Sequence, residues 1–215
     1  MINADWRDCH HMASIGITGG VATGKSTVSR ELAERLGRRL AVRLFSSDFE
    51  ARRLTDSDFV VQEEIKSAFG IQVCDPEGNL ARDRLRELVF HDAAARRILE
   101  SILHPRIRQA WISWTKGDGL LLVEIPLLYE TGAESHFDRI IVTACSRDSQ
   151  VERIVSERNL SHELAEHIIQ SQMDLEEKIR QADWVVWTDC PADITRRQIQ
   201  LIFQEVIERY GGASR

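Results

Sequence analysis

The segment GITGGVATGKSTV, residues 16–28, decides the fold that we expect for this chain. Gly19 is followed by four residues and then by Gly24, Lys25 and Ser26, which matches the pattern G-x-x-x-x-G-K-[ST] in full. Glycines let a backbone wrap closely around an anion, with several N–H groups turned toward it. The segment therefore predicts a loop that binds the phosphate groups of a nucleotide.

The residues around this loop indicate a strand before it and a helix after it. SIGIT (14–18) is a short apolar run of the kind that forms a buried strand. Val28, Leu32 and Leu36 recur at the spacing of one helix face, and Gly37 is the expected C-cap. The N-terminus of such a helix adds partial positive charge at the loop, which favours an anion there.

The loop residues have separate expected tasks in holding ATP. Lys25 is expected to reach the β- and γ-phosphates and to take part in catalysis, and the Ser26 hydroxyl to ligate Mg²⁺. The loop alone leaves ATPases, GTPases and small-molecule kinases open. The N-K-x-D segment with which a GTPase reads guanine is absent, and the short chain with two helical inserts favours a kinase. The residues expected to bind ATP in this loop are Gly19, Gly20, Val21, Ala22, Thr23, Gly24, Lys25, Ser26 and Thr27.

Four further apolar runs, 40–45, 120–125, 139–144 and 184–187, predict strands that alternate with helical patterns. That alternation is typical of a parallel sheet covered by helices. We expect an α/β protein with the P-loop NTPase kinase fold, a five-stranded parallel sheet flanked by helices. The last helix carries one apolar stripe, formed by Ile199, Ile202, Phe203, Val206 and Tyr210.

Two helical excursions interrupt the alternation. Residues 49–115 are too long for a simple crossover and are expected to form a substrate-binding insert, and residues 146–182 a mobile lid. The alternative is that both are ordinary crossover helices. The remaining segments, 14–48, 116–145 and 183–210, are expected to form the nucleotide-binding core.

Composition and charge limit the classes of partner. The formal net charge is −6 over 215 residues, which argues against non-specific binding of nucleic acid, because that needs a basic surface. The most apolar stretch, 119–128, is interrupted by Glu124 and Pro126 and is too short to span a bilayer, and no run of the signal-peptide type is present. We expect small-molecule partners, neither nucleic acid nor membrane, and a monomer or a weak homo-oligomer.

The four cysteines, Cys9, Cys74, Cys145 and Cys190, lie far apart and never in CxxC spacing. This pattern suits reduced thiols and a cytoplasmic location better than a disulfide framework or a zinc site. The CHH triplet at residues 9–11 could hold a metal, but no further ligand is nearby in sequence. We therefore interpret it as part of a flexible leader.

Segments after the loop follow the order found in the dephospho-coenzyme A kinase family, which this chain resembles over residues 14–206. SSDFEARRL (46–54) resembles the family's D-A-D-x-x-A-R, IPLLYE (125–130) its P-L-L-F-E, and QADWVVWT (181–188) its A-D-x-V-I-x-N. This ordered set is more specific than the loop alone. The other matching segments are FG (69–70), EGNLAR (77–82), LVF (88–90), LHPRIR (103–108) and QVER (150–153).

The resemblance implies that ATP phosphorylates the ribose 3′-hydroxyl of dephospho-CoA, giving CoA and ADP in the last step of coenzyme A synthesis. It also implies that Asp48, which matches the family's second Asp of D-A-D, is the general base. Asp48 directly follows the second expected strand, at the edge of the sheet where ligands bind. A lone Asp in this place is alternatively a helix N-cap.

Further substrate contacts follow from the resemblance alone. Arg52 of the A-R pair, and His104 and Arg108 of the HP-x-I-R segment, are expected to contact the substrate. Glu130 of PLLYE is expected to belong to the same group. The alternatives are a solvated helix residue for Arg52, a packed core histidine for His104, and a helix N1 residue for Pro105.

Three more residues are expected to serve the phosphates. Glu124 ends a buried strand, where a carboxylate is costly without a partner, and could hold a magnesium-bound water. Arg153 in the lid is expected to stabilise charge on the transferred phosphoryl group, or else to be an exposed, salt-bridged residue. Arg158 is expected to contact ATP, although the family's second lid arginine aligns with Glu157.

Three further positions depart from the family pattern. Ser46 replaces the first Asp of D-A-D, Ala22 replaces a loop glycine, and Thr188 stands where an Asn usually frames the adenine. Trp184 and Trp187 flank the last of these, and they either stack on a base or pack in the core. The alternatives left open for function are another small-molecule P-loop kinase and a nucleotide-binding protein with weakened catalysis.

Overall fold

The computed structural model describes residues 12–116 and 118–211, in two compact units. One unit comprises the described residues up to Phe45 and from Thr115 onward, and the other is Ser46–Trp114. Residues 9–11, with the CHH triplet, lie outside the described residues. Within the described ranges, no helix combines the length and apolarity needed to cross a membrane.

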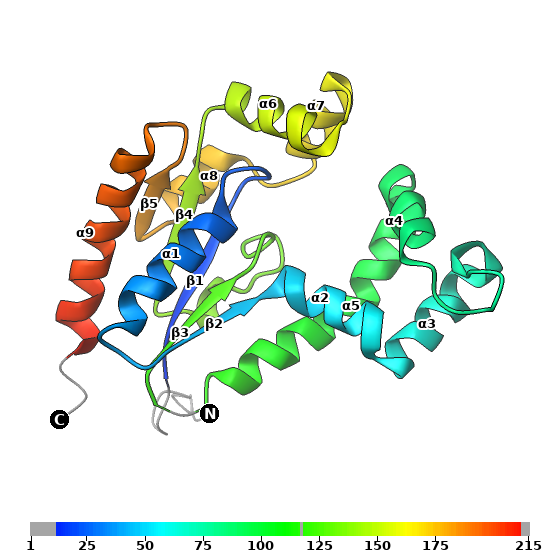
Figure 1. The fold of residues 1–215 in the computed structure, drawn as a ribbon, viewed down its shortest axis with the longest axis horizontal. Helices are drawn as coiled ribbons and strands as arrows, with labels where there is room; N and C mark the ends of the chain where they lie inside the picture. The colour runs from blue at the N-terminus through cyan, green and yellow to red at the C-terminus, as the bar shows by residue number, and fades with distance from the viewer. Residues whose placement is uncertain (1–11, 117, 212–215) are drawn as a thin grey trace, which may run out of the picture. The chain divides into compact units, whose positions relative to one another are not determined.

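The first unit is built on a five-stranded sheet with the strand order β2-β3-β1-β4-β5 (Figure 1). The central strand β1 runs parallel to both neighbours, so that Ile15 lies opposite Leu122 on β3 and Arg139 on β4. The predicted sheet is confirmed, and each strand lies within two residues of its expected bounds. The strands are β1 (Ala13–Gly19), β2 (Val42–Ser46), β3 (Leu120–Glu124), β4 (Arg139–Ala144) and β5 (Trp184–Trp187).

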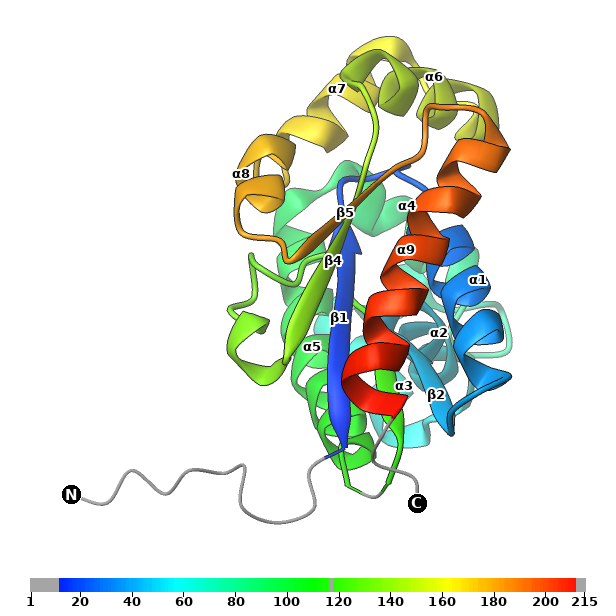
Figure 2. The same cartoon turned by 90° about the vertical axis from the view of Figure 1, so that its left-hand side faces the viewer.

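Helices cover both faces of this sheet. Helices α1 and α9 pack together on one face, and α8 contacts β4 on the other (Figure 2). Helices α6 and α7 pack against each other in the connection from β4 to α8. The helices of this unit are α1 (Lys25–Gly37), α6 (Arg147–Arg158), α7 (His162–Gln170), α8 (Leu175–Arg180) and α9 (Ala192–Tyr210), with a 3-10 turn at Glu134–His136.

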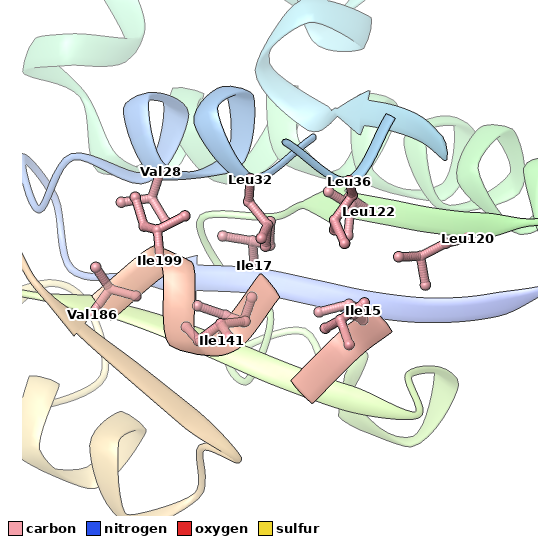
Figure 3. Close-up of a cluster of buried hydrophobic side chains, with 12 residues drawn as sticks. Ile15, Ile17, Val28, Leu32, Leu36, Leu120, Leu122, Ile141, Val186 and Ile199 are labelled. Carbon is pink, nitrogen blue, oxygen red and sulfur yellow. The ribbon is translucent and has the colours of Figure 1, made fainter. Parts of the chain in front are cut away.

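The main core lies between the sheet and the pair α1 and α9. Figure 3 shows Val28, Leu32 and Leu36 on one side of α1, directed toward strand residues such as Ile17. Their spacing brings all three onto one stripe of the helix, so a single contact with the sheet buries them together. The predicted stripe of α9 is confirmed as well, with Ile199, Ile202 and Val206 buried and Phe203 and Tyr210 partly buried.

The predicted C-cap of α1 is wrong. Gly37 is the last helical residue, and Arg38 caps the helix with a φ of −77°. The backbone N–H of Arg38 bonds to the carbonyls of Arg35 and Leu36 in a right-handed turn. Because the chain leaves the helix in this way, no residue with positive φ is needed there.

The second unit is helical. Its longest helix, α5, runs through Pro105, so the alternative that Pro105 opens a helix is wrong. Pro105 has no N–H group, so it cannot donate the helical hydrogen bond to a carbonyl of the preceding turn. The guanidinium of Arg106 fastens this part of α5, with hydrogen bonds to the Ile102 carbonyl at 2.7 Å and to Glu64 on α3 at 2.6 Å. The helices of this unit are α2 (Ser47–Ser57), α3 (Phe59–Phe69), α4 (Arg82–His91) and α5 (Ala93–Trp114), with a 3-10 turn at Gly70–Val73.

Leu32→Ala tests the core between α1 and the sheet. Leu32 is 0% exposed, so the truncation leaves a cavity, and we expect the free energy of unfolding to fall by about 2–5 kcal/mol. The matched control is Leu201→Ala on α9, because Leu201 is 67% exposed and its truncation should cost less than about 0.5 kcal/mol. Urea unfolding measures both, and equal losses would contradict this description of the core.

Candidate active site

The predicted phosphate-binding loop joins the end of β1 to the start of α1, and two glycines determine its shape. Gly19 has a φ of 152°, and a Cβ there would lie 2.3 Å from the carbonyl oxygen of Thr143. Gly24 has a φ of 79° and is the N-cap of α1. The first position excludes a side chain by contact and the second disfavours one by its backbone conformation, so the path of the loop depends on glycine at both.

Ala22 adopts the conformation for which the family pattern uses glycine. Its φ is 58°, in the left-handed region, which costs a residue with a Cβ about 1–2 kcal/mol. The Ala22 side chain packs beside Val21 against a small cluster from α6 and α7. The backbone therefore accepts the Cβ at this position, at the cost of local strain.

Groups of the loop and of β4 hold Gly20 and Thr23 in place. Lys25 Nζ donates to the Gly20 carbonyl at 2.7 Å, and Thr23 Oγ1 donates to the same carbonyl at 2.8 Å. The Thr23 hydroxyl also shares a 2.7 Å hydrogen bond with the Thr143 hydroxyl on β4. Because the Thr23 proton goes to Gly20, the Thr143 hydroxyl is the donor in this bond, and its oxygen also lies 3.2 Å from the Thr18 carbonyl oxygen. These contacts fasten the loop to the end of the sheet.

Two side chains of α6 bind the next two loop carbonyls. Gln150 Nε2 donates to the Val21 carbonyl at 2.7 Å, and Arg153 Nη1 donates to the Ala22 carbonyl at 3.0 Å. The alternative of an exposed, salt-bridged Arg153 is wrong, because its partly buried guanidinium bonds to carbonyls and to a hydroxyl. Gln150 was not predicted, since it lies in a charged helical stretch that looks like a solvated surface.

Thr188, which follows β5, binds the fourth carbonyl. Its Oγ1 donates to the Thr23 carbonyl at 3.0 Å, and Arg153 Nη2 donates to the Thr188 carbonyl at 2.7 Å. Each carbonyl of residues 20–23 therefore accepts a hydrogen bond from a side chain. Carbonyls that are bonded in this way do not compete with an anion for the loop's N–H groups.

The tip of the loop also makes an apolar contact with the segment predicted to form a lid. Val21 is buried together with Val151 and Ile154 of α6 and Ala165 of α7. The Val21 N–H donates to Gln172 Oε1, between α7 and α8, at 2.9 Å. In Figure 2 the segment between β1 and α1 lies directly below α6 and α7. Helices α6 and α7 therefore pack on the loop itself, and their motion as a lid stays a prediction.

A cavity of about 490 Å³ adjoins the loop at Gly20. Trp187, which is 44% exposed, lines this cavity together with Gln150 and Gln172. Trp184 instead packs against the main core, and its Nε1 donates to Glu205 at 2.7 Å. Core packing is confirmed for Trp184, and base stacking by Trp187 stays a prediction.

Ser26 and Glu124, both expected at a metal site, are in contact. Ser26 Oγ donates to Glu124 Oε1 at 2.5 Å, and Ser29 Oγ donates to Oε2 at 3.0 Å. Glu124 is only 3% exposed, so these hydrogen bonds offset the cost of burying its carboxylate. Ser29 was not predicted, although its place one turn after Ser26 is a signal that could have indicated it.

The chemistry of this pair fits Mg²⁺. That ion takes oxygen ligands and is commonly held by one or two carboxylates together with substrate phosphates. The Ser26 hydroxyl and the Glu124 carboxylate supply two such groups at the first turn of α1. In the described part of the chain, no group of three or more His, Cys, Asp or Glu residues could hold a metal ion.

Glu130, expected to contact the substrate, lies in an ion pair. Its Oε1 is 2.7 Å from Nζ of Lys178 on α8, and it accepts a hydrogen bond from the Met173 N–H at 3.0 Å. Lys178 is fully buried. Its burial was not predicted, because a lysine in the charged stretch of α8 has the pattern of a solvated face. A contact between Glu130 and the substrate stays a prediction.

The two positions considered for a second lid arginine, Glu157 and Arg158, are both exposed at the end of α6. Neither side chain makes a hydrogen bond or an ion pair with another described residue. Asn159 ends the helix directly after them with a φ of 53°. The contact between Arg158 and ATP therefore stays a prediction.

In the second unit, Asp48 lies exposed in the first turn of α2. The N-cap of this helix is Ser46, whose Oγ accepts a hydrogen bond from the Phe49 N–H at 3.4 Å, so the alternative of Asp48 as the N-cap is wrong. Among the described residues, no hydrogen bond or ion pair engages the Asp48 carboxylate, which leaves it available to a ligand. Ser46 begins the helix as the family's Asp would, since both are favoured at N-caps.

The other residues expected to contact the substrate form two pairs on the helices of this unit. Arg52 follows Asp48 at i+4 on α2 and is exposed. His104 is partly buried on α5, and Arg108 follows it at i+4 and is exposed. Residues four apart lie on one face of a helix, so each pair shares a face. Their contacts with the substrate stay predictions.

Tyr129 stands where the family's P-L-L-F-E segment has Phe. Its hydroxyl is buried and has no hydrogen-bond partner. Burial raises the pKa of Tyr129 to about 12, and the negative charges of Asp183 and Glu134 add to the effect. A buried hydroxyl without a partner destabilises the folded state, because it loses its hydrogen bonds to water.

Comparison with known proteins identifies relatives along nearly the whole chain. Residues 13–193 match the family model described as dephospho-CoA kinase. A dephospho-CoA kinase from Fusobacterium nucleatum subsp. nucleatum is 37% identical over 174 residues, covering 80% of this chain and 87% of the relative. The solved structure of a dephospho-CoA kinase from Campylobacter jejuni is 29% identical, with a TM-score of 0.62, and covers 91% of this chain and 98% of the other.

A shikimate kinase from Acinetobacter baumannii, solved in complex with shikimate, is more distant. It is 17% identical with a TM-score of 0.51, and covers 93% of this chain and 96% of the other. At this identity the likeness shows the shared kinase fold alone.

Tyr129→Phe tests the unpartnered hydroxyl. We expect the free energy of unfolding at pH 7 to rise by about 1 kcal/mol, because the variant removes a buried polar group and keeps the ring. The pKa of Tyr129 in the folded state, about 12, exceeds the ordinary value of 10.0, so wild-type stability falls as the pH rises between them and the gain from Phe grows. Denaturant unfolding measures both effects. Tyr210→Phe is the control, since Tyr210 is only partly buried, and equal gains in both variants would contradict the assignment.

Proposed function

The chain belongs to the dephospho-CoA kinase family, and we propose how its residues carry out the ATP-dependent phosphorylation of dephospho-CoA. The product is CoA, so the reaction completes coenzyme A biosynthesis. The observation that supports the proposal is the contact of Ser26 with Glu124. It lies directly beside the loop, where the carbonyls of residues 20–23 each accept a hydrogen bond from a side chain. That arrangement offers N–H groups, an ammonium and metal-binding oxygens to one triphosphate.

The loop and α1 bind and align the triphosphate of ATP. Backbone N–H groups and the positive end of α1 attract the phosphate oxygens. Lys25, which donates to the Gly20 carbonyl in this structure, binds the β- and γ-phosphates when they are present. Ser26 and Glu124 would hold Mg²⁺, and the bound ion would neutralise phosphate charge. Phosphoryl transfer depends on alignment and charge neutralisation, and these residues supply both.

Asp48 acts as the general base toward the acceptor. Its carboxylate takes the proton of the ribose 3′-hydroxyl while that oxygen forms a bond to the γ-phosphorus and the bond to ADP breaks. Arg52, His104 and Arg108 bind the substrate and orient this hydroxyl. The helical segment 49–115 is then a substrate-binding insert.

Two arginines serve the phosphates from the lid segment 146–182. A guanidinium has five N–H donors, and Arg153 donates three hydrogen bonds, one to Ala22 and two to Thr188. Arg153 can therefore bind an anion without releasing the loop, and its charge stabilises the phosphoryl group during transfer. Arg158 adds a second positive charge toward ATP.

The free thiols support a reducing compartment as the place where the reaction occurs. Cys74, Cys145 and Cys190, the cysteines in the described ranges, are all free, as in proteins of a reducing compartment. We place the enzyme in the cytoplasm, as a monomer or a weak homo-oligomer. Its partners are ATP and dephospho-CoA, and it binds no nucleic acid.

Asp48→Asn tests the general base, because the amide keeps the size of the side chain and loses the proton acceptor. In a single turnover with dephospho-CoA we expect the rate of phosphoryl transfer to fall about 10²–10⁴-fold. The Kd for ATP should stay within about twofold of wild type. The matched control is Asp58→Asn, because Asp58 caps α3 with a 3.1 Å hydrogen bond from the Val61 N–H and Asn caps helices equally well.

An unchanged rate in Asp48→Asn would remove Asp48 from the mechanism. Absence of any transfer to dephospho-CoA by the wild type would overturn the function itself. A thermal-shift series then tests whether the protein is instead another small-molecule kinase of this fold. Dephospho-CoA should raise the Tm of the protein, and nucleosides should not.

A further inference from the structure

Lys178 of α8 is a fully buried cation to which the mechanism above gives no task. Its Nζ lies 2.7 Å from Glu130 Oε1, 3.4 Å from the Pro126 carbonyl oxygen and 3.5 Å from the Gly19 carbonyl oxygen. An ammonium has three N–H donors, and these three acceptors match them in number. The ion pair with Glu130 is the closest of the contacts, and the two carbonyls complete the surroundings of the charge.

The two carbonyls belong to segments that lead into the active site. Gly19 directly precedes residues 20–23, the four residues whose carbonyls are each bonded by a side chain. Pro126 comes two residues after Glu124, and its carbonyl also accepts a hydrogen bond from Thr18 Oγ1 at 3.2 Å. One buried charge therefore links the ends of β1 and β3, the strands that lead into the loop and carry Glu124.

The electrostatics of this site favour a task beyond packing. A buried ion pair contributes little to stability compared with apolar residues of the same shape, because both charges lose their hydration. A cation close to a carbonyl oxygen polarises the whole peptide group, however. The Gly19 carbonyl shares its peptide group with the N–H of Gly20, so Lys178 makes that N–H a stronger donor.

We propose that Lys178, held by Glu130, is a positioning residue for the phosphate-binding loop. It fixes the first carbonyl of the loop and the segment after β3, and so maintains the backbone shape that binds a nucleotide. It touches neither ATP nor dephospho-CoA. Glu130 acts indirectly, because it holds Lys178 in place. Its carboxylate also accepts a hydrogen bond from the Met173 N–H, which connects the segment before α8 to the Lys178–Glu130 ion pair. The inference rests on the proposed function for the identity of the nucleotide.

Lys178→Met and the double variant Lys178→Met/Glu130→Gln separate positioning from a contribution to the fold alone. The single variant leaves a carboxylate without its cation, and we expect the Tm to fall by several degrees and the Kd for ATP to rise about tenfold. The double variant has no unpaired charge, and its amide oxygen still accepts from the Met173 N–H. We expect its Tm to return toward wild type while the Kd for ATP stays raised about tenfold, because the Gly19 carbonyl still lacks the cation.

Calorimetric titration with ATP and Mg²⁺ gives the Kd, and thermal unfolding without ligand gives the Tm. Arg38→Met is the matched control, because it breaks an exposed ion pair with Glu34 at the far end of α1 and should change neither value. A double variant that binds ATP as tightly as wild type would overturn the proposal, since the pair then serves the fold only. A double variant that does not fold would overturn it for the same reason.

The same titration tests this inference independently of the proposed function. If wild-type protein binds ATP but transfers no phosphoryl group to dephospho-CoA, the proposed acceptor is wrong. The comparison of Kd values between wild type and the double variant still decides the task of Lys178 in that case.

Discussion

The carbonyl groups of residues 20–23 are each bonded to a side chain, and these bonds hold the backbone of the phosphate-binding loop in the first unit. The donors to the carbonyls of residues 20–23 come from the loop itself, from α6 and from the residue after β5. The apolar contact of Val21 with α6 and α7 adds to them. The sheet, helices α6 and α7 and the loop are therefore joined by side-chain contacts at the loop backbone.

The departures from the family pattern are understandable in the same terms. Ser46 replaces a carboxylate and still caps α2, which keeps Asp48 in the first turn of that helix. Ala22 accepts a left-handed backbone where glycine would be unstrained. Thr188 uses its hydroxyl to bind the loop, a task that a side-chain amide could also perform, since both have a donor of similar reach. None of the three removes a group that the proposed transfer needs.

The sequence predicted the parts of the protein that depend on local pattern. Strand bounds, the apolar stripe of α1 and the glycines of the loop follow from periodicity and from a motif that is contiguous in the chain. The carbonyl donors were beyond such reasoning, because Gln150 and Lys178 lie 129 and 159 residues from the carbonyls that they contact. Both residues also stand in charged helical stretches, where a buried polar side chain cannot be told from a solvated one. The cap of α1 was misplaced for a related reason, since a glycine near a helix end predicts a left-handed turn that the backbone need not make.

The central proposal is that this loop aligns ATP for phosphoryl transfer to dephospho-CoA. The measurement that tests it most directly is mass spectrometry of the products after the protein is incubated with ATP, Mg²⁺ and dephospho-CoA. We predict that wild type forms CoA and ADP in equal amounts, and that Lys25→Met, which lacks the ammonium of the loop, forms almost none. ADP released without CoA, or CoA formed equally well by the variant, would contradict the account.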